Sequence, residues 1–244
     1  MDVNFKIIIP CYNVEQWITN CIKSVYLQTY KNWHCIILND KSTDSTAKVI
    51  EEAIPAEFKS KFTVNNNETN VGAMHNIING IKQISDDPED VIALLDGDDW
   101  LATKYALEYV NKVYKEGDIW LTYGQYSDVK NNNFGCSAQL TSTHDYRETR
   151  WKTSHLRTYK NKIWNKIKDA DFRGLDGEYY AMAWDLAIMF PLIEMAGINR
   201  IKFIRAVLYK YNNMNPMNDD KKNLKLQMDT DKEIRLKPKY EQLP

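Results

Sequence analysis

The 244-residue sequence predicts an α/β fold in which helices flank a mostly parallel central sheet. Apolar, β-branched runs alternate with helical patterns through the first hundred residues. Strand–helix–strand order implies right-handed crossovers, which make neighbouring strands parallel. Polar clusters follow three of the apolar runs. Because parallel sheets bind ligands beyond the carboxyl ends of their strands, we expect these clusters to share one edge.

The elements of the first half follow from two periodicities. Continuous apolar runs indicate strands buried on both faces. The strands are expected at 6–10, 34–38, 61–64, 91–95 and 119–123. Apolar residues three and four positions apart indicate helices between them. The helices are expected at 14–28, 42–54, 72–84 and 105–115, with Asp44 or Ser45 as an N-cap of the second.

The second half is less regular. A polar loop is expected at 130–139 and a buried helix, containing Pro191, at 182–196. A late strand is expected at 203–211, and the tail from Met228 should be mobile or packed on the surface. Neither a repeat nor a linker interrupts the chain, which predicts a single domain over 1–244.

Composition limits the class of protein. A net charge of −1 does not indicate a nucleic-acid or membrane partner. The N-terminal run ends at Pro10 and is too short for a signal peptide, and no apolar run reaches the ~18 residues of a membrane span. The four cysteines form no C-x-x-C pair, so we expect buried free thiols. These observations predict a cytoplasmic enzyme of a bacterium or an infected host cell.

Charge is distributed unevenly along the chain. Residues 1–140 carry 12 Lys and Arg against 19 Asp and Glu, whereas residues 141–210 carry 13 against 8. An acidic half beside a basic segment suits a site that holds a cation and then an anion. Chance unevenness in a solvated surface is the alternative.

The strongest motif is Leu94-Leu95-Asp96-Gly97-Asp98-Asp99-Trp100, directly after an apolar run. Three carboxylates so close together repel one another unless a cation neutralises them. Mg²⁺ or Mn²⁺ suits that role, usually with water and substrate phosphates in the coordination shell. The alternative is an acidic turn that caps the next helix. The preceding strand and the trailing Trp100 favour the metal site.

Two weaker motifs point to a nucleotide. In Asn39–Asp44, a carboxylate after a strand can accept hydrogen bonds from a base or a ribose, although helix capping explains the segment as well. In Asn70–Asn76, Gly72 at a helix start could let backbone N–H groups approach an anion, or could simply form a turn. The sequence contains neither G-x-G-x-x-G nor G-x-x-x-x-G-K-[ST], which excludes the usual dinucleotide and P-loop sites.

Five motifs, in this order and spacing, resemble the successive signatures of family 2 glycosyltransferases, which have the Rossmann-like GT-A fold. They lie within residues 5–125. Three later segments resemble a less characterised bacterial and viral branch of the family and extend the likeness to about residue 220. The five motifs are Ile7–Asn13, Ser24–Tyr30, Asn39–Asp44, Asn70–Asn76 and Asp96–Trp100, and the later segments are Trp120–Tyr126, Ser154–Thr158 and Ala183–Leu186.

The resemblance implies a nucleotide-sugar pocket. In such a pocket Asp40 would contact the base, commonly uracil, and Asp96 would reach the ribose or the metal. The donor-binding residues are then expected to be Pro10, Tyr12, Asn13, Asp40, Gly72, Asn76, Asp96 and Arg157.

The resemblance also implies a metal and a catalytic base. Asp98, together with Asp96, would hold Mn²⁺ or Mg²⁺ against the diphosphate. Asp185 matches the position of the catalytic base, which would take the proton of the acceptor hydroxyl. Some members supply a late His as a further ligand, but 209–218 contains none, which leaves His155 as the nearest candidate.

The implied activity is a metal-dependent, inverting transfer of a sugar from a nucleotide-sugar, commonly a UDP-sugar, to an acceptor hydroxyl. Residues 1–125 would form the nucleotide-sugar-binding half, 126–220 the acceptor-binding half and 221–244 a C-terminal tail. The acceptor could be a glycan, a lipopolysaccharide, a protein or a modified DNA base, although the charge does not indicate nucleic acid. Basic residues of the middle segment could hold the diphosphate or an acidic acceptor, or form a solvated face. They are Lys152, Arg157, Lys160 and Lys162.

Two departures from the family pattern and two alternative functions remain. Lys41 stands where the family often has Gly, and Trp184-Asp185 offers one acid where many members have two. A nucleotidyltransferase on a similar sheet would normally have a Gly-rich, basic N-terminal loop, which 10–14 is not. A non-catalytic sugar-nucleotide-binding module would have little reason to retain Asp98 and Asp185.

Overall fold

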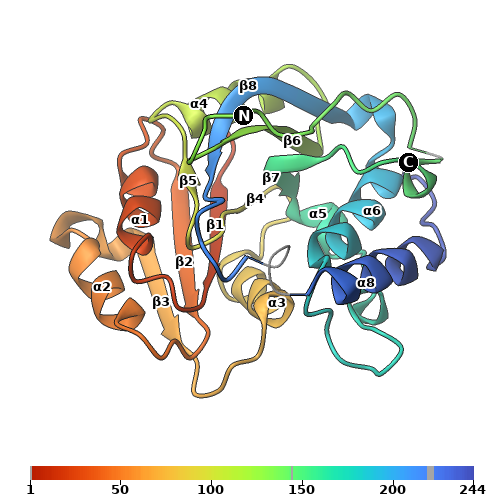
Figure 1. Ribbon diagram of the computed structural model, residues 1–244. Coiled ribbons are helices and arrows are strands. Elements are labelled where there is room, and N and C mark those ends of the chain that lie inside the picture. The colour runs from red at the N-terminus through yellow and green to blue at the C-terminus, as the bar shows by residue number, and fades with distance from the viewer. Residues whose placement is uncertain (1, 144, 219–222) are drawn as a thin grey trace.

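The protein is described by a computed structural model that covers residues 2–143, 145–218 and 223–244. In this part of the chain, eight strands form one sheet in the order β3-β2-β1-β4-β7-β6-β8-β5 (Figure 1). The strands are β1 (Phe5–Cys11), β2 (Trp33–Asn39), β3 (Phe62–Asn66), β4 (Val91–Leu94), β5 (Trp100–Leu101), β6 (Leu121–Asp128), β7 (Ser154–Lys160) and β8 (Ile201–Tyr211). The α-helices are α1 (Ile18–Tyr26), α2 (Thr46–Ala53), α3 (Ala73–Ile84), α4 (Ala106–Lys115), α5 (Asn161–Trp164), α6 (Trp184–Ala196) and α8 (Leu224–Leu236).

The α/β architecture predicted from the sequence is confirmed. Strands β3, β2, β1 and β4 are all parallel, as strand–helix alternation requires. The rest of the sheet is mixed, because β7 runs antiparallel to both β4 and β6, β8 runs parallel to β6, and β5 runs antiparallel to β8. The parallel half therefore brings the carboxyl ends of β1, β2 and β4 to one edge.

Strand β7 was not predicted, and its composition explains why. Its sequence, SHLRTYK, has none of the continuous apolar character of the other central strands. Arg157 and Thr158 are nevertheless buried in the middle of the sheet. Thr158 shares hydrogen bonds with Tyr114 and Thr122, so a polar side chain is accommodated there by polar partners.

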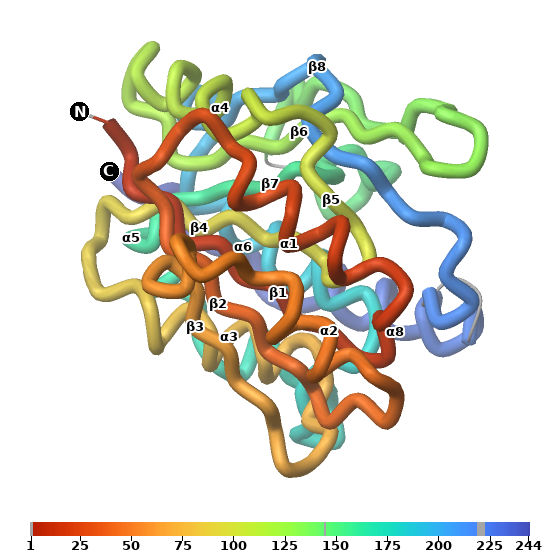
Figure 2. Tube along the Cα trace, turned by 90° about the vertical axis from the view of Figure 1, so that its left-hand side faces the viewer, coloured from red at the N-terminus to blue at the C-terminus, as the bar shows by residue number. Residues whose placement is uncertain are grey.

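Each side of the sheet carries its own core. Along β1, Ile8 packs with α3 and α6, whereas Ile7 and Ile9 pack with α1 and α4. Figures 1 and 2 show α1 and α2 on one side of the molecule and α6 and α8 on the other. Burial on both faces accounts for the unbroken apolar run in β1.

The helices begin one to four residues later than predicted, because turns precede them. In α2, Ser45 is the N-cap residue but makes no capping bond with its side chain. The Asp44 carboxylate accepts from the Thr46 amide instead, at 2.9 Å. Helix α6 contains Pro191, as expected, and is buried from Leu186 to Ala196.

The C-terminal tail is packed rather than mobile. The Leu243 amide donates to the carbonyl of Met195 at 2.9 Å, and the Tyr240 amide donates to the Glu194 carboxylate. The expected start of the tail at residue 221 lies outside the described residues. The buried guanidinium of Arg147 also holds this region. It donates two hydrogen bonds to the Glu194 carboxylate and two to backbone carbonyls at the end of α8.

The four cysteines are all free. Cys11, Cys21 and Cys35 are buried, as predicted, but Cys136 is exposed because it lies in the polar loop after β6. Of the helices in the described parts of the chain, none is long and apolar enough to span a membrane.

The Arg147–Glu194 pair yields a stability prediction. Both side chains are buried, at 3% and 4% exposure, so Arg147→Met leaves a buried carboxylate without its partner. We expect the free energy of unfolding of Arg147→Met to be about 3–5 kcal/mol lower than that of the wild type, as measured by urea denaturation. Lys48→Met is the matched control, because the Lys48–Glu52 pair is exposed and its loss should cost less than about 1 kcal/mol. Equal losses for the two variants would contradict the prediction.

Candidate functional site

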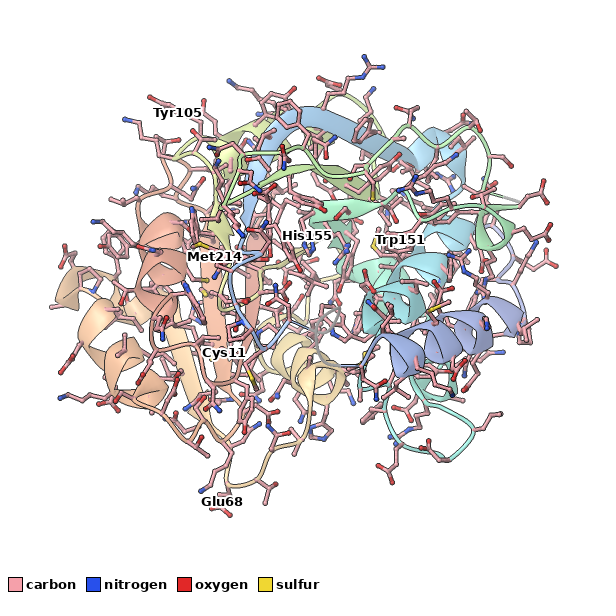
Figure 3. All side chains as sticks on the ribbon, in the orientation of Figure 1. Cys11, Glu68, Tyr105, Trp151, His155 and Met214 are labelled. Carbon is pink, nitrogen blue, oxygen red and sulfur yellow. The ribbon has the colours of Figure 1, made fainter. Side chains whose placement is uncertain are left out.

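A cavity of about 320 Å³ lies beyond the carboxyl ends of β1, β2 and β4. The end of β1, the turn after β4, strand β7, the start of α6 and the segment after β8 all contribute to its wall. Cys11 and His155, labelled in Figure 3, border it from the two halves of the sheet. Nine of the eleven predicted site residues line it: Pro10, Tyr12, Asp40, Asn76, Asp96, Asp98, His155, Arg157 and Asp185. Asp40 and Asp98, which follow different strands, therefore share one site.

The turn after β4 lies directly against the end of β1. The Gly97 amide donates to the carbonyl of Pro10 at 3.2 Å. A Cβ atom at position 97 would lie 2.4 Å from the Cβ of Cys11, so only glycine allows this approach. The glycine thereby brings Asp96 and Asp98 next to Pro10 and Tyr12.

The third aspartate of the motif is an anchor. Asp99 is buried, and its two carboxylate oxygens accept from the Tyr209 hydroxyl at 2.7 Å and the Asn212 amide at 2.6 Å. Burial and the neighbouring charges of Asp98 and Asp96 raise its pKa well above the usual range. Asp99 therefore ties the acidic turn to the end of β8.

The segment after β8 completes the wall on this side. Asn215 donates to the Asp98 carboxylate at 2.7 Å, and the Asp96 backbone amide donates to the Tyr209 hydroxyl oxygen at 3.3 Å. Sequence analysis missed Asn215, Tyr211, Asn218 and Gln227 as lining residues. They lie in or beside an unpatterned polar stretch, and nothing local links that stretch to the acidic turn.

Asp40 organises the loop before α3. Its carboxylate accepts from the backbone amides of Val71 and Gly72, at 2.9 and 2.8 Å, and from the Asn67 side chain. Gly72 adopts φ 84°, which favours glycine. It does not line the cavity, and its N–H is occupied by Asp40 rather than directed at a ligand. The start of α3 was expected to bind an anionic ligand, but the Asp40 carboxylate of the chain itself occupies that place.

Asn13 also lies outside the main cavity. Its side-chain oxygen accepts from the Thr43 backbone amide at 2.8 Å, and the backbone amide of Asn13 donates to the Ser42 hydroxyl. It lines a neighbouring cavity instead, together with residues at the start of α1 and residues 214–217. The β1–α1 and β2–α2 loops are thereby held together.

Arg157 and Asp185 form an ion pair at the opposite wall. The guanidinium of Arg157 donates to the Asp185 carboxylate at 2.8 Å, and also to the carbonyl of Thr153. Arg157 reaches this place because the β4–β7 register sets it opposite Leu94, two residues before Asp96. Its side chain is 4% exposed and that of Asp185 is 22% exposed, so the carboxylate is the more accessible member of a pair that lines the cavity.

His155 is held in an aromatic stack. Its ring lies 4.4 Å from that of Tyr209, with an interplanar angle of 19°, and also stacks with Tyr211. Burial and the charge of Arg157 lower its pKa well below the usual range. The imidazole is therefore neutral at pH 7 and has a nitrogen able to accept a proton or bind a metal.

The carboxylates of the cavity suit a hard cation. Asp96 and Asp98 both line it, and their carboxylate oxygens are ligands of the kind that a hard cation prefers. Within the described ranges, no group of three or more His, Cys, Asp or Glu side chains forms a cage for a metal. An ion held by these two aspartates would take its remaining ligands from water or from phosphates, which is the coordination that Mg²⁺ prefers.

The basic residues of 141–210 do not gather at the cavity, contrary to the expectation of a cation site beside an anion site. Arg157 is the one Lys or Arg among the described residues that line it, and it is paired with Asp185. Lys160 and Lys162 pair with Glu89 elsewhere, and Lys152 does not line the cavity. The uneven charge along the sequence therefore does not become a basic patch at the site.

The sequence of this chain is similar to those of known proteins. The model of the family described as Glycosyl transferase family 2 matches residues 6–172. The chain is 35% identical over 134 residues to UDP-Glc:alpha-D-GlcNAc-diphosphoundecaprenol beta-1,3-glucosyltransferase WfgD of Escherichia coli, covering 54% of this chain and 49% of that protein. The chain spans half or less of the length of such relatives, down to 15% of Glycosyltransferase GlyA of Streptococcus pneumoniae.

Solved structures show the same fold. S. aureus TarS 1-349 in complex with UDP-GlcNAc is similar with a TM-score of 0.65 and 20% identity, over 87% of this chain and 59% of that chain. The mannosyltransferase PcManGT from Pyrobaculum calidifontis, in complex with GDP-Man and Mn²⁺, is similar with a TM-score of 0.59 and 12% identity, over 86% and 57% of the two chains.

The neutral His155 yields a pH prediction. Because its pKa is lower in the folded chain, the unfolded chain alone takes up a proton below about pH 6.5, and stability is lost as the pH falls. His155→Phe keeps a stacking ring and removes this loss. We expect the stability difference between variant and wild type to shift in favour of the variant by about 1.4 kcal/mol per pH unit below 6.5. Urea denaturation across this pH range measures it, and a difference that does not change with pH would contradict the prediction.

Proposed function

The chain belongs to glycosyl transferase family 2, and we propose that it transfers a sugar from a UDP-sugar to an acceptor hydroxyl with the help of Mn²⁺ or Mg²⁺. The observation that carries the proposal is the meeting of Asp40, Asp96 and Asp98 with Asp185 around one cavity. UDP as the nucleotide of the donor is supported by WfgD, named for UDP-Glc, and by TarS, crystallised with UDP-GlcNAc.

The donor would lie across the parallel half of the sheet. Pro10 and Tyr12 border the cavity at the end of β1, and Asn76 borders it from the first turns of α3. Asp40 lies between them, and its oxygens already hold the 67–72 loop. We infer that Asp40 shapes the nucleoside end of the site as well as facing it.

The aspartates support the proposal of a cation. A diphosphate that approached Asp96 and Asp98 directly would be repelled by both carboxylates. These residues fit Mn²⁺ or Mg²⁺, which when bound would neutralise charge on the departing diphosphate. Asn215 orients the Asp98 carboxylate, and Tyr209 accepts from the backbone amide of Asp96.

Asp185 is the proposed catalytic base. It lies in the first turn of α6, is partly exposed to the cavity and is held by Arg157. From there it would accept the proton of the acceptor hydroxyl while the oxygen attacks the anomeric carbon. Attack opposite the leaving diphosphate inverts that carbon.

A nucleotide-sugar donor and four free cysteines favour action in the cytoplasm.

Donor binding tests the cation site. UDP with Mn²⁺ should stabilise the wild type by about 2.7 kcal/mol at a hundred times Kd, seen as a rise in melting temperature. Asp98→Asn should lose most of this rise, because an amide is a weaker ligand for a hard cation. Asp86→Asn, outside the cavity, is the control. An Asp98→Asn variant with the wild-type rise would show that the cation binds elsewhere.

Turnover tests the base. Asp185→Asn should keep the thermal response to UDP and Mn²⁺ but lower kcat of transfer roughly 10²- to 10⁴-fold, the usual contribution of general-base catalysis. The readout is release of nucleoside diphosphate from a panel of nucleotide-sugars and acceptors. Asp169→Asn is the control: Asp169 pairs with Arg173 and does not line the cavity, so this variant should transfer at the wild-type rate. Unchanged transfer by Asp185→Asn would refute its role, and release of pyrophosphate from a nucleoside triphosphate would indicate a nucleotidyltransferase instead.

A further inference from the structure

A basic surface lies in the otherwise acidic first half of the chain. The segments 19–33, 56–61 and 102–112 carry six Lys and two Glu, whereas residues 1–140 as a whole carry 12 Lys and Arg against 19 Asp and Glu. Five of the six lysines are exposed and the sixth is partly exposed. The net charge of −1 hides this surface, because the acidic residues lie elsewhere. The lysines are Lys23, Lys31, Lys59, Lys61, Lys104 and Lys112.

Contacts between the three segments make the surface continuous. The Thr29 amide donates to the carbonyl of Lys104 at 2.8 Å, which joins the end of α1 to the start of α4. The Lys61 ammonium donates to the carbonyl of Lys31 at 2.6 Å, and the Lys31 ammonium lies 5.6 Å from the centre of the Phe58 ring. The middle segment is thereby joined to the same place, and the six lysines belong to one region of the surface.

The joint between α1 and α4 is held by a buried side chain. The amide nitrogen of Gln28 donates to the carbonyls of Ser24 and Thr103, at 2.9 and 2.8 Å, and its oxygen accepts from the Leu107 amide at 3.0 Å. Gln28 itself is not exposed. The groups on either side of this joint therefore keep their spacing, so they can meet a partner together at little entropic cost.

Three large apolar side chains are exposed among the lysines. Leu27, at the end of α1, and Tyr105, at the start of α4, are each 51% exposed, and Tyr109 is 44% exposed. The two tyrosines are four residues apart on α4 and so lie on the same side of the helix. We call the six lysines and these three side chains the lysine–tyrosine face. A tyrosine has an apolar ring and a polar hydroxyl, which suits the boundary between lipid headgroups and acyl chains.

Most of the positive charge of the lysine–tyrosine face is directed to a partner outside the chain. Within the described residues, Lys112 is the one lysine of this face that pairs with a carboxylate, that of Glu108 at 3.3 Å. Lys23 and Lys104 make no ion pair there, and the Lys104 ammonium lies 5.1 Å from the centre of the Tyr105 ring. An anionic partner is therefore attracted to this face.

The composition of the face favours a lipid surface over a protein or a nucleic acid. Protein interfaces are enriched in Arg and depleted in Lys, and Arg binds carboxylates and phosphates through two parallel hydrogen bonds. The face has lysine alone, and the first arginine of the sequence is Arg147. Lysine acts as a point charge, which suits the diffuse negative potential of an anionic bilayer. Leu27 would gain little from a phosphate backbone but can enter the apolar layer of a membrane.

We propose that the lysine–tyrosine face binds the surface of an anionic lipid bilayer, with Leu27, Tyr105 and Tyr109 among the headgroups. This binding goes beyond the transfer reaction and does not depend on it. The face lies beside the start of β2, whereas the cavity lies beyond the carboxyl ends of the parallel strands. Figure 3 shows Tyr105 far from Cys11. A molecule bound to a membrane in this way keeps its cavity open to the solvent.

Sedimentation of the full chain with phosphatidylcholine vesicles, with and without phosphatidylserine, tests the proposal. We expect binding to the anionic vesicles alone, and weaker binding as salt is added, because counter-ions screen the lysines. Lys23→Gln combined with Lys104→Gln should weaken binding roughly twenty- to thirtyfold, since each lysine near an anionic membrane contributes a factor of about five. The matched control is Lys225→Gln combined with Lys232→Gln, which removes two exposed lysines of α8 and should bind like the wild type.

A second pair of variants tests the apolar contacts. Leu27→Ser combined with Tyr105→Ser should weaken binding to the anionic vesicles roughly tenfold, because less apolar surface leaves water. The salt dependence should stay that of the wild type, since the lysines are unchanged. Phe134→Ser is the control, because Phe134 is 73% exposed and lies in the loop after β6, outside the lysine–tyrosine face.

Four results would overturn the inference. They are equal binding to neutral and anionic vesicles, no binding to either, wild-type binding by the double lysine variant, and tighter binding to a single-stranded DNA oligonucleotide than to anionic vesicles at the same salt concentration. The thermal response to UDP and Mn²⁺ is measured on the same samples and should be equal in all variants, because none of the substituted residues lines the cavity. Its absence in the wild type would refute the proposed function and leave the membrane assignment to the vesicle result.

Discussion

The close contact between the end of β1 and the turn after β4 determines the rest of the site. The parallel pairing of β1 with β4 brings Gly97 against Cys11 with no room for a side chain. That contact places the acidic turn beside Pro10 and Tyr12. Any residue other than glycine would push the carboxylates away from the strand end to which the other site residues are attached.

Gathering aspartates at one edge has an energetic cost, and the fold offsets it with hydrogen bonds. Each carboxylate that faces inward has donors from elsewhere in the chain, as Asp40 has from the loop before α3 and Asp99 has from the end of β8. Asp96 and Asp98 line the cavity from the same turn, and carboxylates this close in sequence repel one another. In the proposed function a divalent cation held by these two residues would reduce that repulsion.

Arg157 connects the two halves of the molecule. It stands on β7, opposite β4, and pairs with Asp185 at the start of α6. A buried cation at this place supports the proposed catalytic base next to the parallel strands. The ion pair therefore fixes the position of the proposed base relative to β4, the strand that precedes the proposed metal ligands.

The sequence alone determined the parallel half of the fold and the composition of the acidic turn, because apolar periodicity and short motifs are local properties of the chain. Strand β7 and the segment after β8 escaped prediction, since their polar residues are buried by partners distant in sequence, as Thr158 is by Tyr114. Gly72 was assigned to a ligand, but the folded chain uses its N–H to bind Asp40. Tertiary structure decided which carboxylates face the cavity and which serve as anchors, because that depends on the donors that other strands bring to each oxygen.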